Sequence, residues 1–199
     1  MRTTIAALLL LAAFACTAEA QVLNVAETLG RGKRAVFFSE NRLYIEGDEI
    51  NVVYGQYTLG LSDRLDVCLA VGQTRIYGDG QMYLAVGENW NLFTWHGWSV
   101  SAYNMISVPL ERRQEASLAL LNAMLIMSLR LNNHVAFYSG MNSLWPIGRA
   151  ERGVFTPPSK KFNLPLGTAI SWSESRWTTF MEADLGRLRS VGVGLARTF

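Results

Sequence analysis

Two histidines, His96 and His134, are the near-neutral acid–base groups of this chain. His96 opens the run His96-Gly97-Trp98-Ser99, so hydrolysis by a serine and a histidine is one chemistry to consider. Such a hydrolase needs its base within hydrogen-bond reach of the nucleophile, together with an orienting group and an oxyanion site. Both histidines adjoin predicted turns, where a surface role is favoured. We therefore predict no catalytic residue.

Metal and cofactor chemistry are also disfavoured by the residue spacing. No pair of His or Cys stands at metal-ligand spacing, and no G-x-x-x-x-G-K phosphate loop occurs. Cys68 has no His or Lys near it in sequence to activate its thiol. We expect no metal and no cofactor.

The last ten residues predict the element that would position the remaining polar groups. Apolar Val191, Val193 and Leu195 alternate with small residues, and the chain stops on Phe199. Alternation at period two places one set on each face of a strand. A large apolar face backed by glycine, alanine and threonine suits a strand with lipid outside and a crowded lumen inside.

A C-terminal strand ending in Phe resembles the closing strand of bacterial outer-membrane β-barrels. The pieces Ala-Glu-Thr-Leu-Gly-Arg-Gly-Lys at 26–33 and Gly-Leu-Ser-Asp-Arg-Leu-Asp at 60–66 also resemble small, porin-like members of that class. The resemblance covers residues 21–199 and implies the barrel fold and the outer-membrane location. It implies that Phe199 is part of the signal read by the barrel-assembly machinery. It implies no activity, because barrels of this size serve as anchors, pores, adhesins and enzymes.

The N-terminus has the order of a secretory signal peptide. Arg2 precedes a short apolar run, and Ala18-Glu19-Ala20 supplies a cleavage site, so residues 1–20 are predicted to be a leader and 21–199 the barrel domain. A lipoprotein signal at Cys16 is the alternative. The chain has 18 Lys and Arg against 16 Asp and Glu, too balanced for a strong overall field.

Turn signals and alternating runs divide the rest of the chain into ten candidate strands. Half of all residues are hydrophobic, yet no segment after the leader has the pattern of a membrane-spanning helix. Apolar residues distributed over short strands are what a barrel wall requires. The predicted strands are 34–46, 50–61, 65–74, 81–87, 98–108, 118–131, 134–142, 164–173, 176–184 and 190–199.

The connections and the tryptophans give the barrel an orientation. In an even-stranded barrel the second, fourth, sixth and eighth connections should be tight periplasmic turns. Three of the four are short, whereas the fourth, 88–97, is about ten residues long against the usual two to five. Five tryptophans fall at or beside these ends, as an aromatic girdle would. They are Trp90, Trp95, Trp98, Trp172 and Trp177.

Residues 111–131 are ambiguous between helix and strand. The run Glu-Arg-Arg-Gln-Glu-Ala followed by Leu, Ala and Met consists of good helix formers. A helix there would be apolar nearly all round, whereas a strand has one fully apolar face and one mixed face. We predict the strand.

The predicted strands direct a set of polar side chains into the lumen. A charge inside a low-dielectric wall needs a partner, so Arg130 is expected to pair with Asp66 or Glu182. Such a network makes either a closed polar plug or a narrow conducting path, because ten strands leave an interior that side chains largely fill. The set comprises Gln56, Asp66, Tyr103, Asn122, Arg130, Tyr138 and Glu182.

The opposite, outward end is rich in basic residues. They would attract phosphates of outer-leaflet lipopolysaccharide, although scattered solvated charges are an equally good interpretation. Nucleic acid is disfavoured as a partner because the chain is predicted to be exported. The basic rim comprises Arg112, Arg113, Arg149, Arg152, Lys160, Lys161, Arg187 and Arg189.

The sequence thus predicts an all-β chain that forms one antiparallel transmembrane β-barrel of ten strands, with eight as second choice. Its expected role is structural, interactive or that of a narrow pore. Two alternatives stay open. One is an outer-membrane hydrolase of lipid A or phospholipid. The other is a secreted soluble β-protein that binds a small apolar ligand.

Overall fold

The fold is known from a computed structural model of the chain. It describes residues 26–45, 48–76, 79–110, 119–147, 162–172, 176–185 and 189–199. The predicted leader therefore lies outside the described residues. In the described ranges, no helix is long and apolar enough to cross a membrane.

Eleven strands make up the described secondary structure, and their order follows the chain. Their bounds are β1 Arg34–Ile45, β2 Asp48–Ser62, β3 Leu65–Ile76, β4 Asp79–Trp95, β5 Trp98–Pro109, β6 Ala119–Arg130, β7 Val135–Ile147, β8 Phe162–Asn163, β9 Pro165–Trp172, β10 Trp177–Asp184 and β11 Arg189–Thr198.

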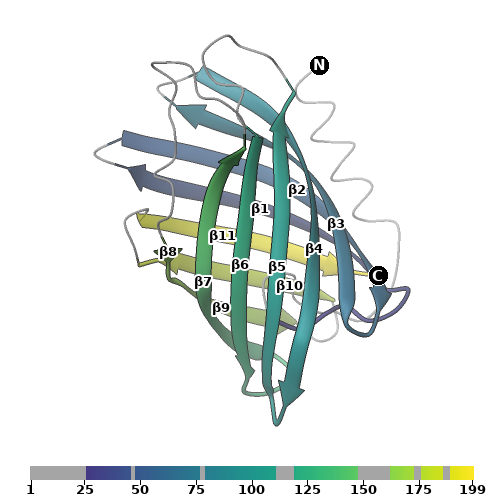
Figure 1. Cartoon of the computed structure of the whole chain (residues 1–199). Helices are drawn as coiled ribbons and strands as arrows, with labels where there is room; N and C mark the ends of the chain where they lie inside the picture. The colour runs from purple at the N-terminus through teal and green to yellow at the C-terminus, as the bar shows by residue number, and fades with distance from the viewer. Residues whose placement is uncertain are drawn as a thin grey trace.

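Ten of these strands close into a ring (Figure 1). Each strand pairs antiparallel with its neighbour, and β7 pairs directly with β9. The ring closes where β11 pairs with β1, from Ala35↔Thr198 to Tyr44↔Arg189. The two-residue β8 pairs with Asn142 and Ser143 of β7. The predicted single, ten-stranded antiparallel barrel is confirmed, and eight strands is wrong.

The alternation in sequence sets which side chains face the lumen. On β11, Val191 and Val193 are exposed, whereas Ala196 and Thr198 are buried. Successive side chains of a strand point to opposite faces, so the register of a strand decides for all its residues which ones face the lumen. The wall is therefore apolar outside and small or polar inside, as the sequence indicates.

Strand β4 is much longer than the predicted 81–87. It runs to Trp95, and the fourth connection is the tight turn His96-Gly97 in place of a ten-residue loop. A β-bulge between Asn91 and Phe93 shifts the register, so Leu92 and Phe93 are both exposed. The bulge breaks the period-two pattern, which is why the sequence alone suggests a loop there.

The ambiguous segment is a strand where it is described. β6 covers Ala119–Arg130 and pairs with β5 and β7 along its length. Leu125 and Met127 face outward, and Ile126 and Ser128 are buried inside. The predicted strand and its two faces are confirmed.

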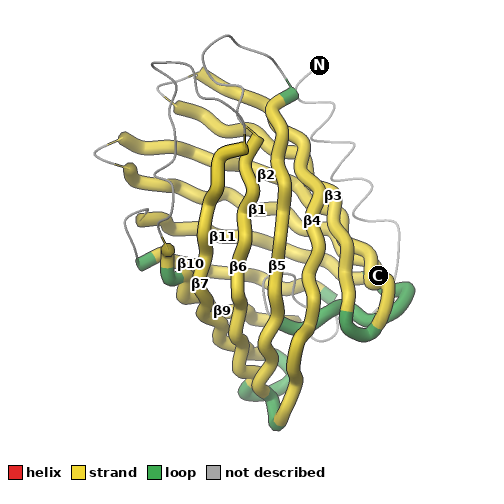
Figure 2. Tube along the Cα trace, viewed as in Figure 1, coloured by secondary structure: helices red, strands yellow, loops and turns green. Residues whose placement is uncertain are grey.

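The two ends of the barrel differ in their connections. At one end, called here the tight-turn mouth, short connections join β2 to β3, β4 to β5, β6 to β7 and β9 to β10. Phe199 lies at this same end, hydrogen-bonded to Arg34 at the start of β1, and Ala26 lies there beside Asn91 and Ser128, near the ends of β4 and β6. Figure 2 shows that most described loops gather here. The connections at the other end fall mostly outside the described residues.

Candidate functional site

The lumen is the candidate site, and three of the predicted polar residues are among its buried side chains. Gln56, Asp66 and Tyr138 are buried. Tyr103 lies within 3.4 Å of Gln56 Oε1 and 3.6 Å of Cys68 Sγ, so residues of β2, β3 and β5 meet. A small pocket lies among Gln56, Asp66, Cys68 and Tyr103. The seven predicted residues nevertheless do not form one continuous network.

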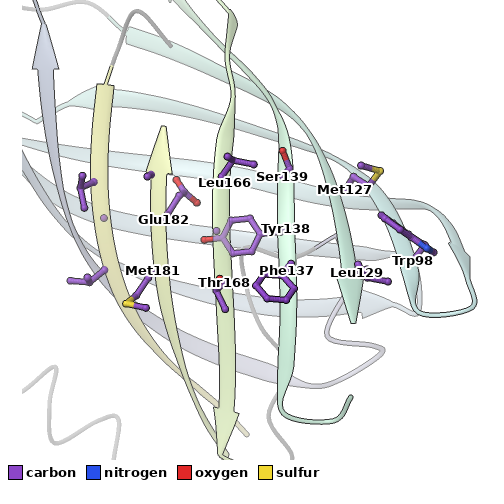
Figure 3. A pocket seen from close by; sticks show the side chains of 15 residues that line it. Trp98, Met127, Leu129, Phe137, Tyr138, Ser139, Leu166, Thr168, Met181 and Glu182 are labelled. Atoms are coloured by element: carbon purple, nitrogen blue, oxygen red, sulfur yellow. The ribbon is translucent and has the colours of Figure 1, made fainter. Parts of the chain in front are cut away.

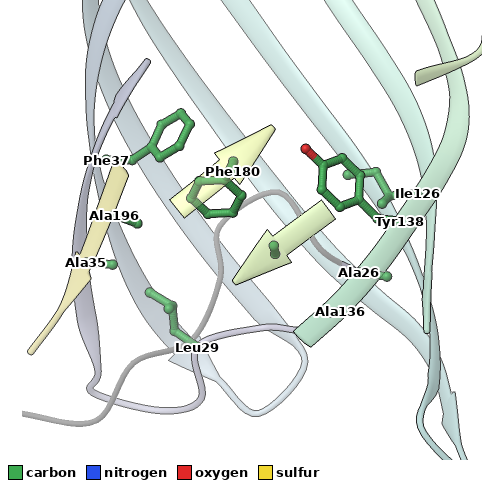
Figure 4. Close-up of a cluster of buried hydrophobic side chains, with 10 residues drawn as sticks. Ala26, Leu29, Ala35, Phe37, Ile126, Ala136, Tyr138, Phe180 and Ala196 are labelled. Atoms are coloured by element: carbon green, nitrogen blue, oxygen red, sulfur yellow. The ribbon is translucent and has the colours of Figure 1, made fainter. Parts of the chain in front are cut away.

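Aromatic rings fill the middle of the lumen. The Phe37 ring contacts the Phe180 ring edge to face at 5.1 Å and the Tyr54 ring at 5.5 Å. Phe37 and Phe180 are nearly fully buried (Figure 4). A Cβ added at Gly194 would lie 2.7 Å from the Phe37 ring. The ring therefore occupies the place of the missing side chain, and the wall must carry glycine there.

A second ring lies over a second glycine. Tyr138, Gly167, Glu182 and Gly192 are consecutive cross-strand neighbours on β7, β9, β10 and β11. A Cβ at Gly167 would lie 2.0 Å from the Tyr138 ring. Figure 3 shows the Tyr138 hydroxyl directed toward the Glu182 side of this row. The outer surface of the same wall carries a shallow hollow of apolar side chains, among them Phe137 and Met181.

Residues 26–33, called here the strap, cross the tight-turn mouth before β1 begins. Ala26 and Leu29 are buried and belong to the same cluster as Phe37 and Phe180 (Figure 4). Ala26 N–H donates to Ser128 Oγ at 3.2 Å on β6. Leu29 N–H donates to the two Asp66 carboxylate oxygens at 2.9 and 3.2 Å on β3. The strap therefore spans the mouth from one wall to another.

The strap and the loop between β2 and β3 fit each other closely. Thr28 Oγ1 donates to the Asp63 carbonyl oxygen at 2.7 Å, and Gly32 N–H donates to the Gly60 carbonyl oxygen at 2.8 Å. A Cβ at Gly60 would lie 1.9 Å from the Gly30 carbonyl oxygen. The two short pieces that resemble outer-membrane barrels in sequence, 26–33 and 60–66, are thus one contact in space.

Arg130 has a different partner from the one expected. Its guanidinium pairs with the Glu27 carboxylate of the strap, and the predicted pairing with Asp66 or Glu182 is wrong. Asp66 is occupied by the Leu29 amide. Glu27 precedes all predicted strands, so an argument from strand faces could not include it.

The histidines lie on the surface, without a serine hydroxyl as partner among the described residues. His96 is in the β4–β5 turn, with a φ of 45° and its ring 4.5 Å from the Trp95 ring. Ser99 is fully buried, and its Oγ lies 3.1 Å from Thr94 Oγ1. His134 Nδ1 lies 3.1 Å from the Ser171 carbonyl oxygen. The geometry assembles no acid–base pair at either position.

The predicted girdle tryptophans lie toward the tight-turn mouth. Trp95 and Trp98 flank the β4–β5 turn, and Trp172 and Trp177 are paired at the ends of β9 and β10. The Arg197 guanidinium lies 5.3 Å from the Trp177 ring centre and from that of Phe199. Trp90 lies further along β4 and is also exposed.

Of the predicted basic rim, only the backbone of Arg189, at the start of β11, is described. The other seven residues fall outside the described ranges. Sequence reasoning missed the residues that hold the strap, because a strand pattern does not show which side chains of the wall meet residues 26–33. They are Gly60, Asn91 and Ser128.

Comparison with known proteins gives likenesses of fold. No family model and no curated protein matches the sequence. The KdgM porin is similar at a TM-score of 0.47 and 6% identity, over 83% of this chain and 99% of that one. An outer membrane channel from Pseudomonas putida F1 is similar at 0.48 and 10%, over 90% and 100%. The N-terminal β-barrel domain of Pseudomonas aeruginosa OprF is similar at 0.40 and 11%, over 85% and 99%. At these TM-scores the likenesses do not decide a function.

Proposed function

We propose that this chain is an outer-membrane β-barrel protein whose occupied lumen gives it a structural or interaction role. The observation that carries the proposal is the inverted polarity of the wall. Val86, Met181 and Val193 are 58%, 56% and 54% exposed, whereas Ser99 and Ser101 are fully buried. Apolar side chains around the whole exterior are stable in hydrocarbon and unfavourable in water.

The packing of the lumen supports a closed barrel over an open one. Rings of β1 and β10 meet in the middle, and the strap crosses the tight-turn mouth. A solute path along the axis would have to pass both. In this proposal the barrel is therefore closed along its axis by the rings and by the strap.

A narrow pore is the second candidate, and one observation favours it. The side-chain oxygens Asn89 Oδ1, Asn122 Oδ1 and Asn142 Oδ1 are buried and have no hydrogen-bond partner within the described part of the chain. Buried polar atoms are usually paired, so these carbonyl groups are suited to binding water. A file of water along β4, β6 and β7 would be the beginning of a conducting path.

Catalysis is not part of the proposed role. A lipid hydrolase would need an imidazole beside a serine hydroxyl, and the partners of His96 and His134 are Trp95 and a backbone carbonyl. Incubating the purified protein with labelled lipid A and phospholipid tests this. Release of fatty acid that depends on either histidine would establish an enzyme.

The proposed partners are lipid, lipopolysaccharide at the basic rim, and the barrel-assembly machinery acting on Phe199. Neutralising Arg149, Arg152, Lys160 and Lys161 should weaken lipopolysaccharide binding, most strongly at low salt. Unchanged binding by the fourfold variant would remove the rim from the proposal.

The membrane location is tested by the response of the wall to a charge. Val193→Arg places a guanidinium on the exposed face of β11 and should cost about 2–4 kcal/mol of stability in lipid. The wild type should require detergent and migrate differently on gels before and after heating. A processed chain that stays monomeric in buffer alone, or that tolerates Val193→Arg without loss, would contradict the location. Planar-bilayer recording then separates the two roles, since a closed barrel stays silent.

A further inference from the structure

The strap is held by hydrogen-bonding partners that three strands supply. Ser128 on β6 accepts the Ala26 amide, and Asn91 Nδ2 on β4 donates to the Ala26 carbonyl oxygen at 2.7 Å. Asp66 on β3 accepts the Leu29 amide with both carboxylate oxygens. These groups bind main-chain atoms, which every peptide carries.

One further contact adds selectivity for an acidic residue. Arg130, at the end of β6, pairs with the carboxylate of Glu27. The Arg130 side chain is 35% exposed and that of Glu27 is 16% exposed, so the pair lies at the edge of the mouth. An arginine that pairs with a carboxylate recognises both charge and geometry.

We propose that the tight-turn mouth is a binding site for an extended acidic peptide, that residues 26–29 occupy it in cis, and that the strap thereby controls access to the lumen. Residues 26–29 form no strand and take part in no strand pairing of the ten-stranded ring. This segment can leave without breaking the β1–β2 or β1–β11 ladder. Once it leaves, Asp66 and Arg130 are free to bind another peptide of the same chemistry.

Two glycines directly after residues 26–29 supply the hinge that the proposal requires. Gly30 and Gly32 have φ values of 89° and 78°, in the left-handed region that glycine adopts readily. The pair Gly32 N–H to Gly60 carbonyl and Gly60 N–H to Lys33 carbonyl, at 2.8 and 2.9 Å, holds the chain directly after them. The proposed release of residues 26–29 turns about this fixed point next to β1.

Cys68 provides a built-in reporter for the position of the strap. It follows Asp66 by two residues on the lumen face of β3 and is a buried free thiol. Tyr103 and the pocket with Gln56 and Asp66 surround it. A charged, water-soluble thiol reagent should reach it slowly while the strap is in place.

The first experiment reverses the charges of the pair in the full-length processed protein in detergent. Glu27→Arg and Arg130→Glu should each speed Cys68 labelling about tenfold, since each replaces an attraction by a repulsion. The double variant Glu27→Arg/Arg130→Glu should restore slow labelling. Equal rates in all four proteins, or fast labelling of the wild type, would overturn the proposal. Heat-dependent gel migration reports separately whether each barrel has folded.

The second experiment displaces the strap by volume and needs no charge. Gly60→Ala puts a methyl group on the Gly30 carbonyl oxygen and should also speed labelling. Gly55→Ala is the matched control on the same strand, because its methyl group would lie 3.2 Å from the Phe38 ring and 3.9 Å from the Phe37 carbonyl oxygen. If both or neither accelerate labelling, access is not set by the strap.

The third experiment tests the binding site itself. A synthetic peptide of residues 26–33 is added to the Glu27→Arg protein, in which Arg130 is free. The peptide should slow Cys68 labelling, and a peptide with Gln in place of Glu27 should do so less well. No protection by either peptide would show that the mouth does not bind peptide in trans and would overturn that part of the proposal. A failure here leaves the membrane location untouched, since detergent dependence and heat-dependent migration test that separately.

Discussion

The middle of the lumen and its tight-turn mouth are filled by two different parts of the chain. In the middle, side chains of the wall strands lie over glycines of neighbouring strands, as Phe37 does over Gly194. At the mouth, the main chain of the strap is hydrogen-bonded to Asp66, Asn91 and Ser128. The rings cannot leave without unfolding the wall, whereas the strap can. The difference separates a permanent obstruction from a removable one.

The largest effect is expected in the middle of the lumen. Phe37→Ala should lower the free energy of unfolding by about 3–5 kcal/mol, because a nearly fully buried ring is lost and a cavity remains. Urea unfolding in lipid vesicles measures it. Phe37→Leu keeps part of the packing and should lose less. If Phe37→Ala lowered the unfolding free energy less than Asp66→Ala or Thr28→Val, the mouth would contribute more to stability than the middle of the lumen.

The match of ring and glycine gives the next effect. Gly167→Val should cost about 1–3 kcal/mol, because its side chain enters the space of the Tyr138 ring. Tyr138→Ala removes that ring, so the double variant should lose less than the sum of the two single variants. A double-mutant cycle on unfolding free energies checks this. If the two single losses add up to the loss in the double variant, position 167 and the Tyr138 ring do not interact.

Substitutions at the tight-turn mouth should lower the unfolding free energy less than substitutions in the middle of the lumen. Asp66→Ala leaves the Leu29 amide without its acceptor and should cost about 1–3 kcal/mol. Asp66→Asn keeps a carbonyl oxygen and should cost less. Asp63→Ala is the control, since it keeps the main-chain carbonyl that accepts from Thr28 and removes an exposed 3.4 Å contact with the Arg31 amide. The same urea series compares all three.

The smallest effect belongs to one hydroxyl of the strap. Thr28→Val removes the hydrogen bond to the Asp63 carbonyl oxygen and should cost about 1 kcal/mol. Thr28→Ser keeps the hydroxyl and should behave like the wild type. If the valine variant lost as much as Phe37→Ala, the strap would be as integral to the fold as the rings.

The barrel itself was predictable from sequence because period two is a local property. On β11 the alternation gives the strand and both faces, and on β6 it favours the strand over a helix that would be apolar nearly all round; the structure agrees with both. Strand β4 was predicted too short because the bulge at Asn91 makes two successive residues point outward. A strand prediction that requires strict alternation of apolar and polar residues therefore does not extend across the bulge.

The contents of the mouth were not predictable from strand patterns. Glu27 and Leu29 belong to no strand, so their contacts with Arg130 and Asp66 depend on how the chain enters the barrel. The sequence still carried a signal. The pieces 26–33 and 60–66, noticed separately for their resemblance to outer-membrane barrels, are the two sides of one contact.

The seam between β1 and β11 joins the two termini of the domain, with Ala35 opposite Thr198. During synthesis, the first wall strand emerges long before its final neighbour exists. Its open edge must be shielded in the meantime, since unpaired strand edges recruit foreign strands. Contacts so distant along the chain also make closure slow. Loss of β11 would therefore leave the edges of β1 and β10 open at once, and such a truncated chain should aggregate rather than form a smaller barrel.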